Sequence, residues 1–169
     1  MEPGQLFTHL PYYKLYTKSG GGIIIGANST IGRKRNSRSI IGHFYPTKIY
    51  VKNYSALVKI GDNTNLNGVY IACRKSITIG DNCRLASGVV ILDYYGHELH
   101  SQNRTTGIDC PKSIIIGNNV WIGTNSIILK DTTIGDNCVV SCGSIVKGHF
   151  DKNSIIQGNP GVVVGKINI

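Results

Sequence analysis

The 169-residue sequence has few of the residues that build helices. It contains 4 alanines, 9 leucines and 2 glutamates, against 25 isoleucines, 12 valines, 21 glycines and 15 asparagines. Alanine, leucine and glutamate favour helices, whereas β-branched residues suit strands, and glycine and asparagine suit turns. The composition therefore excludes a helical bundle and predicts an all-β chain whose length suits one domain.

Other absences narrow the class of protein. The five cysteines are an odd number without a Cys-x-x-Cys pair, which fits neither a disulfide scaffold nor a zinc knuckle. No apolar run reaches the length of a transmembrane helix, and the first residues lack a basic segment followed by an apolar one. We therefore expect a cytoplasmic protein that does not insert into membranes.

Acidic residues are also scarce. Nine Asp and Glu oppose 18 Lys and Arg, which gives a net charge of +9. Such a charge attracts phosphorylated cofactors, polyanionic polymers, nucleic acid or a membrane surface alike. The longest basic cluster, Arg33 to Arg38, contains no aromatic residue for base stacking. We interpret this cluster as a solvated loop and expect no nucleic-acid partner.

A six-residue repeat organises most of the chain. Aliphatic residues recur six positions apart at Ile116, Ile122, Ile128, Ile134, Val140 and Val146. The phrase Ile-Gly-x-Asn begins at Ile25, Ile60, Ile79, Ile116, Ile122 and Ile134. Its fifth place holds a small or β-branched residue, namely Ser29, Thr64, Cys83, Val120, Ser126 and Cys138.

A helix or a plain alternating strand does not give a strict period of six, but a short extended leg followed by a turn does. Three legs make an 18-residue coil, the spacing from Ile116 to Ile134. Coils stacked about 4.8 Å apart would form a triangular prism with aliphatic columns inside. Glycine, aspartate and asparagine suit its corners because they accept left-handed backbone angles at low cost.

From about Gly21 to Val164 these repeats resemble those of the hexapeptide-repeat acyltransferases. The resemblance implies a left-handed parallel β-helix, a hand that the general preference for right-handed crossovers would not predict. We expect residues 21–169 to form this domain and residues 1–20 to form an N-terminal cap segment.

Two segments interrupt the repeat. The register is lost after Leu92 and resumes near Ser113, which predicts an extruded loop over residues 93–112. A loop of that length in a compact domain is usually functional, although its own hydrogen bonds alone could explain it. The second interruption, from Gly32 to about Lys59, has no comparable acid–base groups and is expected to cover the N-terminal coils irregularly. The first loop gathers Asp93, Tyr94, Tyr95, His97, Glu98, His100 and Arg104.

The loop resembles the excursion that carries the catalytic histidine in galactoside- and maltose-type acetyltransferases. It is most similar to the exopolysaccharide and capsule branch, whose pattern of Asp, spacer, His, acidic residue and Asn-Arg is matched by Asp93, His97, Glu98 and Asn103-Arg104. The family's C-terminal signature is matched by Val120-Trp121-Ile122-Gly123, Gly143-Ser144-Ile145-Val146 and Gly158-Asn159-Pro160. The resemblance implies transfer of an acetyl group from acetyl-CoA to a hydroxyl of a sugar or polysaccharide precursor.

Histidine suits the role of general base because its ordinary pKa, about 6.5, lies near working pH. The resemblance implies that His97 takes the proton of the acceptor hydroxyl, which attacks the acetyl carbonyl directly without an acyl-enzyme. His100 is the alternative base. Asp93, Glu98 and Arg104 are the residues implied to contact the acceptor, and Asp93 or Glu98 could instead orient the imidazole.

The resemblance implies further site residues. Asn67 lies near the family's substrate-side asparagine. Asn65 is the alternative because Ile60 and Ile79 are 19 residues apart, which indicates one inserted residue in this coil. The cations that commonly follow the Gly-Asn-Pro motif are missing, so Lys147 and Lys166 are the candidates for the CoA phosphates. Each site is implied to lie between neighbouring subunits of a homotrimer, without a metal. The residues implied to contact acetyl-CoA are Trp121, Gly123, Thr124, Cys142, Lys147 and Lys166.

Three other functions stay open. The first is N-acetylation of an amino sugar. The second is a γ-type carbonic anhydrase, in which His97 and His100 would be metal ligands, although no third well-placed ligand is apparent. The third is a non-catalytic scaffold, which the fold by itself does not exclude.

Overall fold

The computed structural model describes residues 13–17, 20–32 and 46–168, and its strands form three sheets. Sheet A consists of β1 (Tyr13–Thr17), β4 (Thr47–Val51), β7 (Tyr70–Cys73), β10 (Val90–Leu92), β13 (Ile127–Leu129) and β16 (Ile145–Val146). Sheet B consists of β2 (Gly22–Ile25), β5 (Leu57–Ile60), β8 (Ser76–Ile79), β11 (Ile114–Ile116), β14 (Thr132–Ile134) and β17 (His149–Phe150). Sheet C consists of β3 (Thr30–Ile31), β6 (Asn65–Leu66), β9 (Arg84–Leu85), β12 (Trp121–Ile122), β15 (Val139–Val140), β18 (Ser154–Gly158) and β19 (Gly161–Lys166).

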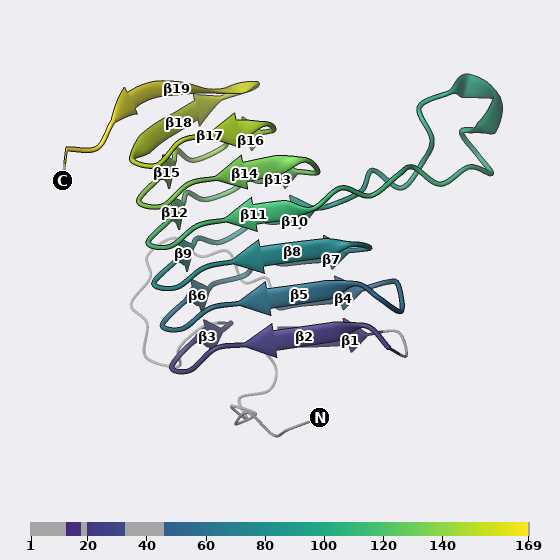
Figure 1. The fold of residues 1–169 in the computed structure, drawn as a ribbon, viewed down its shortest axis with the longest axis horizontal. Helices are drawn as coiled ribbons and strands as arrows, with labels where there is room; N and C mark the ends of the chain where they lie inside the picture. Colours follow the sequence, from purple (N-terminus) through teal and green to yellow (C-terminus); the bar gives the residue numbers. More distant parts are fainter. Residues whose placement is uncertain (1–12, 18–19, 33–45, 169) are drawn as a thin grey trace.

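Apart from β18 and β19, neighbouring strands within a sheet are three strands apart along the chain, so every coil adds one strand to each sheet (Figure 1). The pairings are parallel, except that β19 turns back antiparallel on β18 at the C-terminal end. This arrangement is the predicted parallel β-helix. Within the part of the chain that is described, no helix is long and apolar enough to cross a bilayer.

The interior of the prism is made of the predicted columns. The six aliphatic residues from Ile116 to Val146 are each at most 1% exposed. The fifth-place residues are buried as well, from Cys83 at 0% to Ser29 at 8% exposed. Burial of these branched side chains is the main favourable term that holds the coils together, at about 1.5–3 kcal/mol for each.

The corner between sheets B and C explains the Ile-Gly-Asp-Asn phrase. The carboxylate of Asp81 accepts a hydrogen bond from the N–H of Asp62 in the preceding coil, and Asn118 accepts one from Asp81 in the same way. A Cβ at Gly61 would overlap the Asp81 carboxylate, so the second place must be glycine. The asparagines in the fourth place adopt left-handed angles, for example φ 58° at Asn82.

The N-terminal region differs from the prediction in two places. Strand β1 lies inside the segment expected to be a cap, and it pairs in register with β4, so the first coil starts before residue 21. Strands β4 and β5 are regular strands within the segment expected to be irregular. Residues 1–12 of the cap and the basic cluster from Arg33 to Arg38 lie outside the described residues.

Candidate active site

The loop predicted over residues 93–112 leaves the prism at the corner between sheets A and B. It begins where β10 ends and returns to β11, and it projects well away from the coils (Figure 1). We call it the arm. Its tip carries the 3-10 helix η1 (Ser101–Asn103). The arm is the largest departure from the prism among the described residues, and it carries the candidate base.

Asp93, the first residue of the arm, is fully buried and faces the corner of the preceding coil. Its carboxylate accepts hydrogen bonds from the N–H groups of Arg74 (2.8 Å) and Lys75 (2.7 Å), and the thiol of Cys73 lies 3.3 Å away. Burial raises the pKa of Asp93, although the two amide hydrogen bonds act in the opposite direction. The resemblance implies that Asp93 contacts the acceptor or orients the imidazole, but its carboxylate is turned to the Arg74 and Lys75 amides and anchors the arm.

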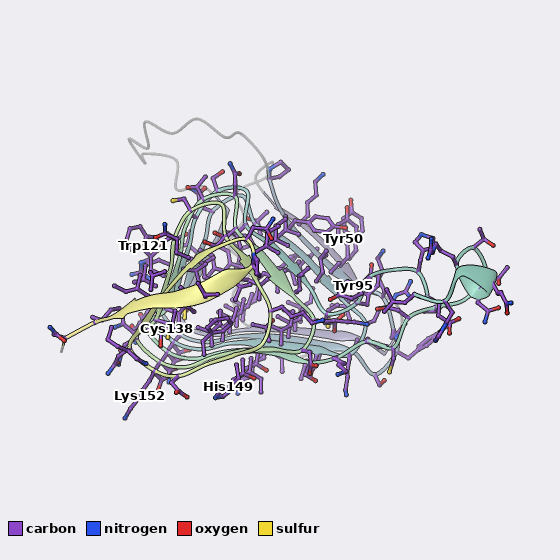
Figure 2. All side chains as sticks on the ribbon, turned by 90° about the horizontal axis from the view of Figure 1, so that it is seen from above. Tyr50, Tyr95, Trp121, Cys138, His149 and Lys152 are labelled. Carbon is purple, nitrogen blue, oxygen red and sulfur yellow. The ribbon has the colours of Figure 1, made fainter. Side chains whose placement is uncertain are left out.

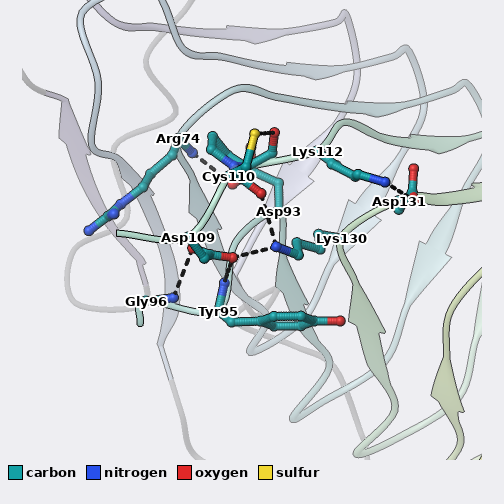
Figure 3. Close-up of polar contacts among 10 residues, drawn as sticks. Arg74, Asp93, Tyr95, Gly96, Asp109, Cys110, Lys112, Lys130 and Asp131 are labelled. Atoms are coloured by element: carbon teal, nitrogen blue, oxygen red, sulfur yellow. Dashed lines mark hydrogen bonds and ion pairs between the residues drawn. The ribbon is translucent and has the colours of Figure 1, made fainter. Parts of the chain in front are cut away.

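Asp109 anchors the returning segment of the arm, which leads back to β11 (Figure 3). Its carboxylate accepts hydrogen bonds from the N–H groups of Tyr95 (2.8 Å) and Gly96 (3.2 Å) and from Lys130 Nζ (2.5 Å). Lys130 also donates to the carbonyl of Cys110 at 2.9 Å. We call the pair formed by Asp109 and Lys130 the latch.

Two consecutive tyrosines fix the root of the arm to the coils on either side of it. The ring of Tyr94 is buried and lies 4.2 Å from the Arg74 guanidinium. The ring of Tyr95 lies 4.4 Å from Lys130 Nζ and 5.8 Å from Lys147 Nζ. Cations at these distances from aromatic rings are attracted to them. Lys147, predicted to contact CoA, therefore lies beside the root of the arm.

His97 is exposed on the arm, with Nδ1 2.9 Å from the carbonyl oxygen of Arg104. A carbonyl only accepts hydrogen bonds, so Nδ1 carries the proton and the lone pair of the neutral ring is on Nε2. The Arg104 guanidinium donates to the carbonyl of Leu99 at 3.2 Å. The structure thus joins His97 and Arg104 through the Arg104 backbone. Glu98 is half-buried against Gly107, and His100 is exposed.

The residues predicted to contact acetyl-CoA fall into separate groups. Trp121 is 55% exposed on the outer face of sheet C, and Gly123 and Thr124 follow it at the corner between sheets C and A. Cys142 lies one coil further on, where a Cβ at Gly123 would be 2.6 Å from its amide nitrogen. Lys166 instead donates to Ser154 at the last coil, so it is separate from this group.

Asn65 and Asn67 differ in one respect that bears on the acceptor. The Oδ1 atom of Asn65 is buried without a hydrogen-bond partner in the described structure. An unpaired buried carbonyl oxygen is costly. Asn67 follows β6 directly, and its N–H donates to the carbonyl of Leu85.

Two segments of the chain match family models. Residues 113–148 match "Bacterial transferase hexapeptide (six repeats)", and residues 57–93 match "Hexapeptide repeat of succinyl-transferase". The galactoside O-acetyltransferase of Escherichia coli is 38% identical over 117 residues. The chain belongs to the hexapeptide-repeat transferases. The two family models cover coils on both sides of the arm and leave most of the arm unmatched.

The alignments of this hexapeptide-repeat transferase with its relatives span different shares of the relatives' lengths. The match to galactoside O-acetyltransferase covers 69% of this chain and 57% of that protein. WbbJ of Escherichia coli, assigned by its name to O-acetyl transfer in lipopolysaccharide biosynthesis, is 29% identical over 92% of this chain and 78% of its own length. A galactoside acetyltransferase solved in complex with coenzyme A superposes with a TM-score of 0.63 at 30% identity, over 84% of this chain and 66% of that one. These likenesses confirm the left-handed β-helix.

Sequence reasoning missed the latch of this hexapeptide-repeat transferase. Asp109 lies in the returning segment of the arm, and Lys130 lies 21 positions later, in the next coil. The loss of the six-residue register shows that an arm exists, but it gives no position for residues within the arm. In the described residues no group of three or more His, Cys, Asp and Glu side chains could hold a metal ion.

We expect Asp109 to titrate below an ordinary aspartate. Burial raises the pKa of its carboxyl, but the hydrogen bonds from Lys130, Tyr95 and Gly96 outweigh this and lower the pKa overall. Stabilisation by the latch is therefore present above the ordinary pKa of about 3.9 and is lost as the pH falls through the lowered value. A carbon NMR titration of the carboxyl should give a midpoint below 3.9, and Lys130→Met should raise it. Equal midpoints in both proteins would contradict this assignment.

Proposed function

We propose that this protein transfers the acetyl group of acetyl-CoA to a hydroxyl group of a saccharide. The observation that carries the proposal is His97, whose Nδ1 is paired with the Arg104 carbonyl so that Nε2 is available as a base. The similarity to galactoside O-acetyltransferase, and to a galactoside acetyltransferase that binds coenzyme A, supports both substrates.

The chemistry follows from the state of the imidazole. Nε2 takes the proton of the acceptor hydroxyl as the oxygen forms its bond to the acetyl carbon. The resulting imidazolium is stabilised because Nδ1–H still donates to the Arg104 carbonyl. The carbon–sulfur bond then breaks, and His97 returns the proton to the leaving thiolate. The hydroxyl proton therefore passes through His97 to the thiolate, and no acyl-enzyme forms. The unpaired Oδ1 of Asn65 and the charge of Arg104 are the proposed contacts for acceptor hydroxyls.

We place acetyl-CoA along the C-terminal coils. Trp121 offers an exposed ring, and the next corner holds buried Gly123 and half-buried Thr124 against the exposed Cys142 of the following coil. Lys147 and Lys166 remain the proposed partners of the phosphates. Figure 2 shows Trp121 on the opposite side of the prism from the arm, so His97 of one chain is remote from this surface of the same chain.

A second copy would bring these two parts together, which supports the proposed homotrimer. The outer face of sheet A carries an apolar row of half-buried side chains, Val90, Ile127 and Ile145. On the arm, Leu99 is 75% and Ile108 is 68% exposed. Sheet A lies between the corner that carries the arm and the corner that carries Gly123. Copies packed through sheet A would therefore place the arm of one against the acetyl-CoA surface of the next.

The test is release of free thiol from acetyl-CoA with a panel of neutral galactosides, acidic oligosaccharides and amino sugars. We expect turnover with at least one hydroxyl acceptor, a product whose acetyl ester mild base removes, and a trimer by light scattering. A product stable to base would be an amide and would indicate N-acetylation. No thermal shift with acetyl-CoA and no thiol release would indicate a scaffold, and zinc-dependent hydration of carbon dioxide would indicate a carbonic anhydrase.

A further inference from the structure

Two lysine–aspartate pairs join the arm to the next coil, and they differ in burial. In the latch, the side chains of Lys130 and Asp109 are 13% and 4% exposed. In the other pair, Lys112 and Asp131 are 53% and 54% exposed. Exposed pairs contribute little, whereas breaking a buried pair leaves an uncompensated charge and is strongly unfavourable. The latch is therefore the pair that can hold the arm in one direction.

The latch acts next to the candidate base. Asp109 accepts the N–H of Gly96, the residue directly before His97. Gly96 has φ +95°, an angle that side-chain-bearing residues rarely adopt, and this turn sets the direction in which the chain enters His97. The hydrogen bond to Asp109 thus holds the turn directly before the imidazole.

Lys130 connects both segments of the arm, the outgoing and the returning one, to the prism. Its ammonium contacts the Asp109 carboxylate and the Cys110 carbonyl on the returning segment, and the Tyr95 ring on the outgoing segment. The residue itself follows β13, which is a regular strand of the prism. The side chain of Lys130 therefore connects both segments of the arm to the end of β13.

We propose that Asp109 and Lys130 are positioning residues for His97 in acetyl transfer, an inference that rests on the proposed function. They touch neither substrate. They hold the arm so that Nε2 of His97 meets the acceptor hydroxyl, and a misplacement of about 1 Å can cost about 10²-fold in rate.

The test compares Asp109→Asn, Lys130→Met and the double variant with Lys112→Met and Asp131→Asn at the exposed pair. Each latch variant should lower kcat about 10–100-fold while the KM for acetyl-CoA stays within about twofold, because neither Asp109 nor Lys130 is proposed to contact acetyl-CoA and Lys147, beside Tyr95, is left unchanged. The double variant should be no slower than the slower single variant, because either substitution alone already breaks the contact between Asp109 and Lys130. Lys130→Arg should recover part of kcat, and the exposed-pair variants should match the wild-type protein.

Hydrogen exchange gives a readout that does not depend on turnover. The amides of Tyr95 and Gly96 should exchange faster in the latch variants, with unchanged exchange in β11 and β14. Wild-type kcat in both Asp109→Asn and Lys130→Met would overturn the inference, as would a loss confined to KM. If Asp109→Asn does not fold, Lys130→Gln decides in its place. Activity retained in His97→Ala would instead refute the proposed function, so the two failures are distinguishable.

Discussion

Replacing His97 by alanine is expected to lower kcat for acetyl transfer about 10²–10⁴-fold, the usual contribution of a general base. The loss should appear in kcat, because His97 is not among the residues proposed to hold acetyl-CoA, most of which lie on sheet C and its following corner. The KM for acetyl-CoA should therefore change little. Steady-state release of free thiol, measured over a range of acetyl-CoA and acceptor concentrations, separates the two constants.

His100→Ala is the matched control for that prediction. His100 is also an exposed histidine of the arm, three residues further along. It has the same side chain but lacks the pairing of Nδ1 with the Arg104 carbonyl, so its replacement should leave kcat within about twofold of wild type. If His100→Ala were inactive and His97→Ala active, the base would be His100. If both kept full activity across the acceptor panel, neither histidine would be the base.

Ile116→Ala is expected to lower the free energy of unfolding by about 2–5 kcal/mol. Ile116 is 1% exposed inside the prism, in register with Ile79 of the preceding coil and Ile134 of the next. Truncation removes apolar burial and leaves a cavity that the stacked coils cannot close, because strand pairing fixes their spacing. Urea unfolding followed by far-ultraviolet circular dichroism measures the loss.

The adjacent residue of the same strand supplies the control. Ile115 is 49% exposed on the outer face of β11. Ile115→Ala makes the same chemical change at the same depth along the helix axis, so it should cost about 1 kcal/mol or less, the span of strand propensity. Similar losses in the two variants would contradict the assignment of alternate residues to the inside and outside of the prism.

The repeat made much of the fold predictable. A residue such as Ile122 or Cys138 is buried because of its place in a six-residue phrase, and that place is legible without any knowledge of distant partners. The corner asparagines were likewise predictable, because a left-handed backbone angle is a local requirement. The start of the first coil was missed because Tyr13–Thr17 carries no phrase of the repeat and becomes a strand by pairing with β4.

The candidate site was predictable only in part, and Asp93 illustrates the reason. Its position in the arm and its spacing from His97 pointed to the acceptor, yet its carboxylate turns back to the amides of Arg74 and Lys75. Those amides come from a corner one coil earlier. Which way a side chain turns at the root of a loop depends on the donors around it, and the spacing of residues along the chain does not give their position.

The sequence by itself determined the prism, its buried columns, its corners and the place where the arm leaves them, because each of these follows from a short period repeated along the chain. The tertiary structure alone decided how the arm is held, through the latch and Asp93, and which nitrogen of His97 is available. These features depend on single contacts between residues 7 to 21 positions apart, and no periodicity encodes them.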